Sequence, residues 1–117
     1  MTTQSFTTTC EPGAVVLVRF TFTSQAGSKF RPAVILSDSA YHASKLDAVM
    51  VPLTSQQTSH YGDTNIVDWQ QAGLLKASIA KGSIQTIERS SVSRRVGTLT
   101  DADLANLKLS LKRILGL

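Results

Sequence analysis

Residues 31–54 read RPAVILSDSAYHASKLDAVMVPLT, and this stretch decides the fold class. Two runs rich in β-branched and other aliphatic residues, at positions 31–37 and 47–54, predict two strands. The polar crossing between them, residues 38–45, predicts a connection with one helical turn near Tyr41. Pro52 predicts that the second strand lies at a sheet edge or has a bulge near its end, because proline cannot donate to a strand ladder.

Similar short runs continue on both sides of this stretch. A Pro12-Gly13 turn precedes a strand at residues 14–20. Further strands are predicted at residues 64–67, 76–80, 83–87 and 93–99. A helix follows, with Thr100 as its N-cap, an apolar stripe from Leu104 to Leu115 and Gly116 as its C-cap. The pattern predicts a mainly β fold with a C-terminal helix, in which a small, strongly bent sheet or barrel is closed by the helix.

The size and composition of the chain fit one globular domain. It has 117 residues, of which 42% are hydrophobic and 17% charged, so a disordered chain is excluded. We expect a flexible N-terminal arm at residues 1–11, which is rich in threonine, and a single domain at residues 12–117. The 12 Lys and Arg residues exceed the 8 Asp and Glu residues, and the net charge of +4 favours an anionic partner.

Cys10 is the only cysteine, so an intrachain disulfide and a zinc site built on cysteines are excluded. No apolar run approaches the roughly 20 residues that span a bilayer. The first residues lack the basic start and apolar stretch of a signal peptide. We therefore expect a cytoplasmic protein that makes no membrane contact.

Polar side chains gather where two predicted strands begin and end. Arg31 begins one strand, and Thr54 ends the next and is followed by Ser55 and Gln56. If the two strands are antiparallel neighbours, Arg31 and Thr54 project from the same rim of the sheet. A guanidinium group beside a hydroxyl group suits a phosphate. In the alternative interpretation, Arg31 pairs with Asp63 or Asp68 and Thr54 merely ends a strand.

The segments 12–18, 29–37 and 51–56 together resemble the MazF/PemK toxin family, the ribosome-independent endoribonucleases of type II toxin–antitoxin modules. The blocks 72–78, 84–87 and 97–100 extend the resemblance over nearly the whole chain after residue 11. It implies an SH3-like barrel of the MazF/CcdB type, a homodimer and a cognate antitoxin whose acidic tail lies across the RNA groove. It also implies sequence-specific cleavage of single-stranded RNA without a metal or other cofactor, leaving 2′,3′-cyclic phosphate and 5′-hydroxyl ends.

The resemblance also assigns roles to residues. Arg31 matches the family's catalytic arginine, and Thr54 matches the hydroxyl residue beside the scissile phosphate. No residue is expected to bind a metal. The residues expected to contact RNA are Lys29, Phe30, Ser55, Gln56, His60, Lys81 and Gln85.

The segment before the Ile-Gln-Thr block departs from the pattern of several relatives. They carry an arginine and an aspartate there as acid/base machinery, whereas this chain reads Lys81-Gly82-Ser83, without a carboxylate. Lys81 is a candidate replacement for the arginine as a phosphate contact. His60 is a candidate base, because an imidazole titrates near neutral pH.

Two other functions remain open at this point. One is a gyrase poison on the same fold, like the CcdB toxins, although the chain ends at residues 114–117 without the tryptophan on which those toxins depend. The other is a nuclease-dead relative that only binds RNA or an antitoxin, which the missing carboxylate favours.

Overall fold

The structure is a computed structural model that describes residues 10–21 and 28–117. In chain order it contains β1 (Ala14–Thr21), β2 (Ser28–Ile35), α2 (Ser39–Ser44), β3 (Asp47–Thr54), β4 (Thr64–Ile66), β5 (Ser78–Ala80), β6 (Gln85–Glu88), the 3₁₀ turn η1 (Arg89–Ser91), β7 (Val92–Thr98) and α3 (Asp101–Leu115). The expected mainly β fold with a C-terminal helix is confirmed. No helix of these two described ranges is long and apolar enough to cross a membrane.

The arm predicted at residues 1–11 falls mostly outside the described residues. Its last two positions are described: Cys10 is buried in the core and Glu11 is exposed. The division into an arm and a domain at residues 12–117 therefore stays a prediction.

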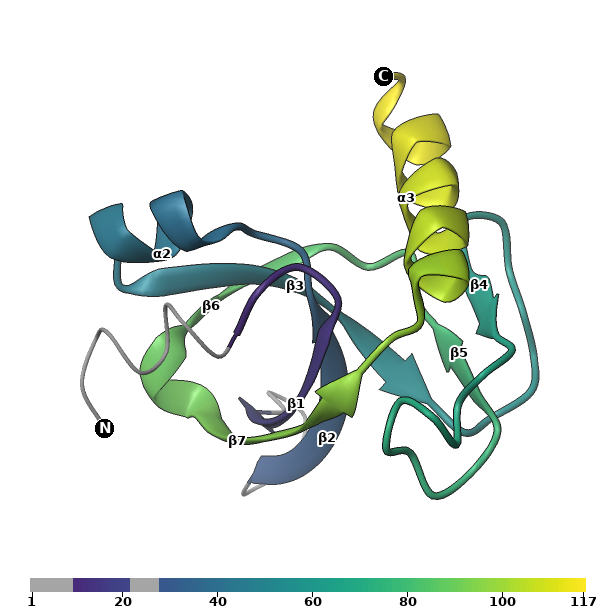
Figure 1. The fold of residues 1–117 in the computed structure, drawn as a ribbon, viewed down its shortest axis with the longest axis horizontal. Helices are drawn as coiled ribbons and strands as arrows, with labels where there is room; N and C mark the ends of the chain where they lie inside the picture. Colours follow the sequence, from purple (N-terminus) through teal and green to yellow (C-terminus); the bar gives the residue numbers. More distant parts are fainter. Residues whose placement is uncertain (1–9, 22–27) are drawn as a thin grey trace.

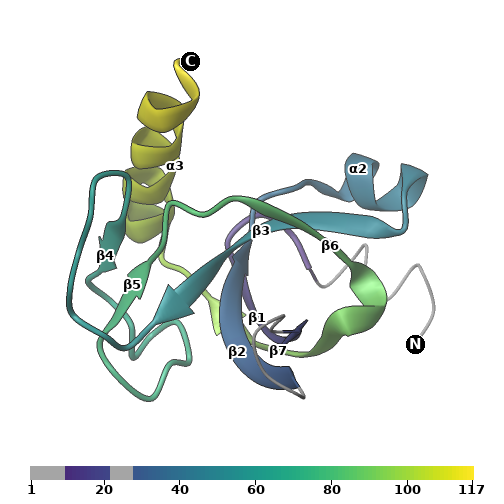
Figure 2. The same ribbon diagram turned by 180° about the vertical axis from the view of Figure 1, so that it is seen from behind.

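All the described strand pairs are antiparallel, in the order β4-β5-β3-β2-β1-β7, and β6 also pairs with β3. The sheet curls so that β1, β2, β3, β6 and β7 surround a common interior (Figure 1). Viewed from behind, α3 stands beside β4 and β5 at one end of this curl (Figure 2). The path of paired strands begins at β4 and ends at β7, so the described part of the sheet is open rather than a closed barrel.

Strand β3 occupies the middle of the sheet, and the edge position predicted from Pro52 is wrong. β2 pairs along one side of β3, and β6 and β5 share the other side. Pro52 cannot donate a hydrogen bond, but its carbonyl accepts one from the Lys81 N–H at 2.9 Å. The irregularity lies in the opposing segment: residues 82–84 stand between β5 and β6, opposite Val51 alone.

The core has two parts because the strands bury both faces of the curled sheet. Val15, Val34 and Val51 belong to the larger cluster, which also contains Leu107 and Leu111 of α3. Their chain neighbours Val16, Ala33 and Met50 lie in the smaller cluster. The two-residue period of a strand explains this division. Core residues on both faces of the sheet therefore hold β2 and β3, the strands that carry Arg31 and Thr54.

The expected cap of α3 is confirmed. The Thr100 hydroxyl oxygen accepts a hydrogen bond from the Asp103 N–H at 3.3 Å, and Gly116 ends the helix in the left-handed conformation with φ 70°. The buried Asp103 carboxylate accepts bonds from the Val67 and Asp68 N–H groups at 3.0 and 2.8 Å. These bonds fasten the first turn of α3 to the chain that leaves β4.

Candidate functional site

The pairing of β2 with β3 brings together Arg31, at the start of one predicted strand, and Thr54, at the end of the next. These two residues form the polar rim that the sequence predicts. Ala33 pairs with Pro52 in an antiparallel ladder, so continuing the same register by two residues places Arg31 opposite Thr54. Arg31 is exposed and Thr54 is half-buried. The two strands are antiparallel neighbours, which is the condition under which Arg31 and Thr54 were expected on the same rim of the sheet.

Two depressions meet at this rim. The larger, here called the main groove, has a volume of about 670 Å³, and the smaller, here called the side hollow, has about 260 Å³. Three polar residues, Arg31, Thr54 and Gln56, line both of them, together with Leu53. A bound molecule that reached from one depression into the other would therefore pass these three side chains.

The main groove carries positive charge on apolar walls. Its charged lining residues are Arg31, Lys76 and Arg94, and none of the described lining residues is acidic. The apolar lining comes from Leu17, Pro32, Leu53, Leu74, Leu75 and Val96. Such a surface suits a ligand that combines anionic groups with flat apolar faces, as a nucleic acid strand does.

One wall of the main groove depends on two glycines. Gly73 has φ 86°, and a Cβ atom there would lie 2.6 Å from the carbonyl oxygen of Val96. A Cβ atom at Gly97 would overlap the carbonyl oxygen of Ala72. Because neither glycine has a side chain, the turn lies directly on β7 and presents residues 74–76 to the groove.

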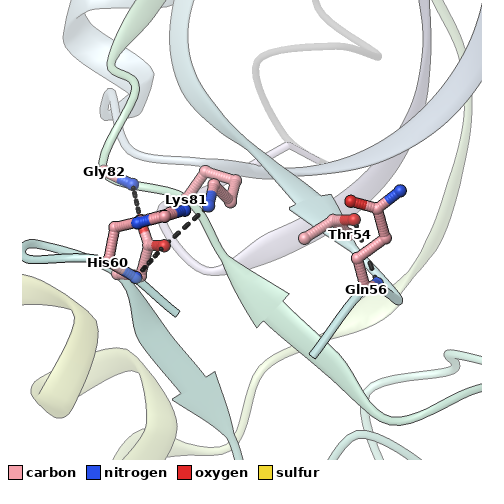
Figure 3. A network of polar contacts seen from close by, with 6 residues as sticks. Thr54, Gln56, His60, Lys81 and Gly82 are labelled. Carbon is pink, nitrogen blue, oxygen red and sulfur yellow. Dashed lines mark hydrogen bonds and ion pairs between the residues drawn. The ribbon is translucent and has the colours of Figure 1, made fainter. Parts of the chain in front are cut away.

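The turn after β3 is held by local hydrogen bonds. The Gln56 N–H donates to the Thr54 hydroxyl oxygen at 3.2 Å (Figure 3), so the hydroxyl proton is available to a ligand in the groove. The Gln57 side chain donates to the carbonyl oxygens of Ser55 and Ala77 at 2.9 and 3.0 Å. These bonds fix the geometry of Thr54, Ser55 and Gln56 relative to the opposite wall.

The side hollow is lined by polar residues of the loop after β3 and by Lys81 at the end of β5. Besides the four shared residues, its lining consists of Pro52, Thr58, His60 and Lys81. His60 is exposed and Lys81 is half-buried. An imidazole and an ammonium group therefore share this hollow with the guanidinium of Arg31.

Asp63 is not among the described lining residues of the side hollow, but its carboxylate connects two segments that line it. Its carboxylate accepts hydrogen bonds from the Lys81 ammonium at 2.7 Å and from the N–H groups of His60 and Gly82, both at 2.9 Å (Figure 3). Burial alone would raise the pKa of this carboxyl group. The hydrogen bond from Lys81 and the two backbone bonds outweigh that effect and lower the pKa, so Asp63 stays ionised.

The structure gathers most of the predicted site residues. Six of the nine line one or both depressions: Arg31, Thr54, Ser55, Gln56, His60 and Lys81. Lys29 and Phe30 are exposed on β2, and the Phe30 ring lies 5.1 Å from the Arg19 guanidinium carbon. Gln85 lies on β6 and pairs with Met50 of β3. These last three lie outside the described linings of the depressions, and their contact with RNA stays a prediction.

Some residues of the site were not predicted from the sequence. Lys76 belongs to the main groove, although only its sequence block had been singled out. The alternative interpretation of the sequence pairs Asp63 with Arg31, whereas the ion pair that Asp63 makes is with Lys81. Asp63 and Lys81 meet because Thr64 pairs with Ala80, which puts the two residues next in register. Asp63 and Lys81 are 18 residues apart, and no short sequence motif indicates a contact over that separation.

The carboxylate, imidazole and thiol groups are dispersed. Within residues 10–21 and 28–117, no three His, Cys, Asp or Glu side chains gather closely enough to hold a metal ion. The independence from metals that the sequence predicts stays a prediction.

A family comparison agrees with the segments quoted from the sequence. The model that describes the PemK-like, MazF-like toxin of type II toxin–antitoxin systems matches residues 11–115. The chain belongs to this toxin family. No relative of this PemK/MazF-like toxin was found among curated proteins.

Solved structures similar to this PemK/MazF-like toxin share its fold. A MazE–MazF crystal structure from Deinococcus radiodurans has a TM-score of 0.77 and 22% identity, and the match covers 93% of this chain and 98% of that one. An endoribonuclease in complex with its cognate antitoxin from a mycobacterial species gives 0.73 and 20%, over 92% and 95%. The Mycobacterium tuberculosis toxin MazF-mt6 gives 0.73 and 19%, over 89% and 97%. At these identities the likeness establishes the fold.

Proposed function

We propose that this PemK/MazF-like toxin is an endoribonuclease that cuts single-stranded RNA at a short sequence. The observation that carries the proposal is the position of Arg31 and Thr54, side by side at the junction of a cationic groove and a second polar hollow. Solved relatives described as endoribonucleases support it. The groove's three cations and apolar walls fit a strand whose phosphates and bases both need contacts.

The chemistry uses the RNA's own 2′-hydroxyl group. The 2′-oxygen attacks the adjacent phosphorus and loses its proton to a base, the bond from phosphorus to the 5′-oxygen breaks, and that oxygen takes up a proton. The products carry a 2′,3′-cyclic phosphate and a 5′-hydroxyl. The positive guanidinium of Arg31 and the Thr54 hydroxyl stabilise the negative charge that develops on the phosphate oxygens. DNA lacks the 2′-hydroxyl and is not cut.

His60 is the proposed base. It lines the side hollow with Arg31 and Thr54, and its backbone N–H is anchored by Asp63. The reaction as written involves no metal ion, so cleavage is expected to continue in EDTA.

The decisive experiment is incubation of the pure protein with a long RNA of known sequence in EDTA. Discrete cuts with cyclic phosphate and 5′-hydroxyl ends, and no cuts in DNA of the same sequence, support the proposal. Activity that is lost in EDTA and restored by Mg²⁺ or Mn²⁺ contradicts the metal-free mechanism. RNA binding without cuts indicates the nuclease-dead alternative, and trapping of gyrase indicates the CcdB-like one.

We further propose that the toxin acts in the cytoplasm as a homodimer of single-domain chains and is neutralised by a cognate antitoxin. Two of the similar structures are complexes with an antitoxin. The cationic lining of the main groove fits an acidic antitoxin segment as well as it fits RNA. Exposed leucines, including Leu75 beside the groove and Leu109 and Leu115 on α3, offer apolar surface for a partner chain.

A further inference from the structure

Asp63 joins two segments that both line the side hollow. One is the loop that carries Thr58 and His60, and the other is the end of β5 with Lys81. The carboxylate bonds to both, through the His60 N–H and through the Lys81 ammonium and Gly82 N–H. It is only 4% exposed and is not among the described lining residues, so it supports the hollow from behind.

The backbone around this carboxylate is packed closely. A Cβ atom at Gly82 would lie 3.0 Å from the carbonyl oxygen of Gly62, so the two segments run against each other there. Gly82 also begins the irregular stretch between β5 and β6, where the ladder with β3 is interrupted. The bonds to Asp63 replace the missing ladder bonds at this point.

We propose that Asp63 is a positioning residue for RNA cleavage, which holds Lys81 and the His60 loop so that the side hollow binds the phosphodiester next to the scissile one. This inference rests on the proposed function. Asp63 would act through Lys81 and would not itself touch RNA.

The geometry of Lys81 permits this role. An ammonium group has three N–H donors, and the ion pair with Asp63 directs one of them away from the hollow. The Lys81 side chain is 26% exposed and lines the hollow, so its other donors can reach a phosphate oxygen. Arg31 lines the same hollow. A strand that crosses the rim would therefore meet two cations.

A positioning role and a role as simple counter-ion predict opposite results for Asp63→Asn. This variant removes a negative charge near the RNA, so a simple counter-ion effect would strengthen RNA binding and leave the turnover number unchanged. The amide of asparagine has one acceptor oxygen and an NH₂ group that faces donors, so it cannot hold Lys81, His60 and Gly82 together. Positioning therefore predicts that kcat falls about 10- to 100-fold and that RNA binding is not strengthened.

The experiment measures kcat and KM on a defined RNA for Asp63→Asn, Lys81→Met and the double variant. If Asp63 acts through Lys81, the Asp63 substitution lowers kcat much less in the Lys81→Met background than in the wild type. Lys81→Met should also weaken binding of single-stranded DNA of the same sequence, which is not cut. It should reduce the salt dependence of that binding by about 0.7 in the log–log slope, the value for one phosphate contact.

Two further variants separate positioning from folding and charge. Glu88→Gln changes the net charge equally at an exposed position of β6, outside the described linings of both depressions, and should cut RNA as the wild type does. Asp63→Glu retains the charge and should recover part of kcat if Asp63→Asn folds poorly. Equal activity of Asp63→Asn and the wild type overturns the inference alone, as does full additivity with Lys81→Met. A wild-type protein that cuts no RNA overturns the proposed function as well.

Discussion

Arg31 is exposed on β2, so its side chain can be removed without opening the core. Arg31→Ala is expected to slow RNA cleavage about 100- to 1000-fold, the usual loss for one donor that stabilises transition-state charge. Arg31→Lys should recover little activity, because an ammonium group cannot form the two parallel bonds of a guanidinium. Cleavage rates and circular dichroism test this together. A well-folded Arg31→Ala protein with the wild-type rate would remove Arg31 from the mechanism.

His60 gives the proposed reaction its pH dependence. If its imidazole accepts the 2′-hydroxyl proton, cleavage requires the unprotonated ring, so the rate is lower at acidic pH. His60→Ala should flatten this pH dependence and slow cleavage about 100-fold or more. A pH–rate profile of both proteins is the measurement. An unchanged profile in the variant would show that the proton leaves by another route.

His42 links folding stability to pH at a second place, away from the site. The Ser37 hydroxyl oxygen accepts a hydrogen bond from the Val49 N–H at 2.9 Å and shares a second hydrogen bond, of 2.6 Å, with the His42 Nε2 atom. Burial first, and then the charge of Arg89, lower the pKa of His42, although Asp38 acts in the opposite direction.

Because the folded state lowers the pKa of His42, the unfolded chain binds the proton more tightly. The stabilisation by the neutral imidazole is therefore fully present above about pH 6.5 and is lost as pH falls from there toward the folded-state pKa. Urea unfolding at pH 7 and pH 5 should show lower stability at pH 5, and His42→Gln should reduce that difference. An equal difference in both proteins would assign it to other groups.

At the scale of elements, the contact between the turn at residues 70–76 and β7 decides the shape of the main groove. Gly97→Ala would push the Ala72 carbonyl away from β7, and overpacking of this kind costs about 1–3 kcal/mol of stability. The groove wall at residues 74–76 would move with it, so RNA affinity should fall too. Thermal unfolding and RNA titration measure the two effects. Ser93→Ala, at an exposed position of the same strand, is the control.

The elements could be predicted well where local chemistry determines them. The bounds of β3 agree with the sequence, and α3 was found from its Thr100 cap, apolar stripe and Gly116. The edge position predicted for β3 is wrong, because a proline in a strand does not show which other strands pair on its two sides. The sequence left a strongly bent sheet and a closed barrel as alternatives, since closure depends on pairing between strands far apart in the chain.

The same distinction applies to the site. Arg31 and Thr54 lie at the ends of consecutive strands, so antiparallel pairing was enough to bring them together. Asp63 and Lys81 meet only through the register of β4 with β5, and Lys76 joins Arg94 of β7 in the main groove only through the turn that rests on β7. Such contacts are set by tertiary packing, which a residue pattern does not reveal.

For the whole molecule we predict a homodimer. Leu75 is 94% exposed and Leu117 is 83% exposed, and burial of such side chains in a partner would remove apolar surface from water. Light scattering at micromolar concentration should give twice the chain mass of 12.6 kDa. A mass of one chain would contradict the dimer and would require each protomer to bind RNA alone.

Because Cys10 is buried, the reactivity of its thiol can be used to measure how often the folded chain opens. The thiol is 2% exposed, packs in the smaller core cluster with Met50 of β3, and is the only one in the chain. An alkylating reagent can reach it only when this cluster opens, so the labelling rate reports the population of opened molecules. RNA or antitoxin that binds the closed form lowers this population by mass action. Slower labelling would thus detect binding even in variants that have lost cleavage.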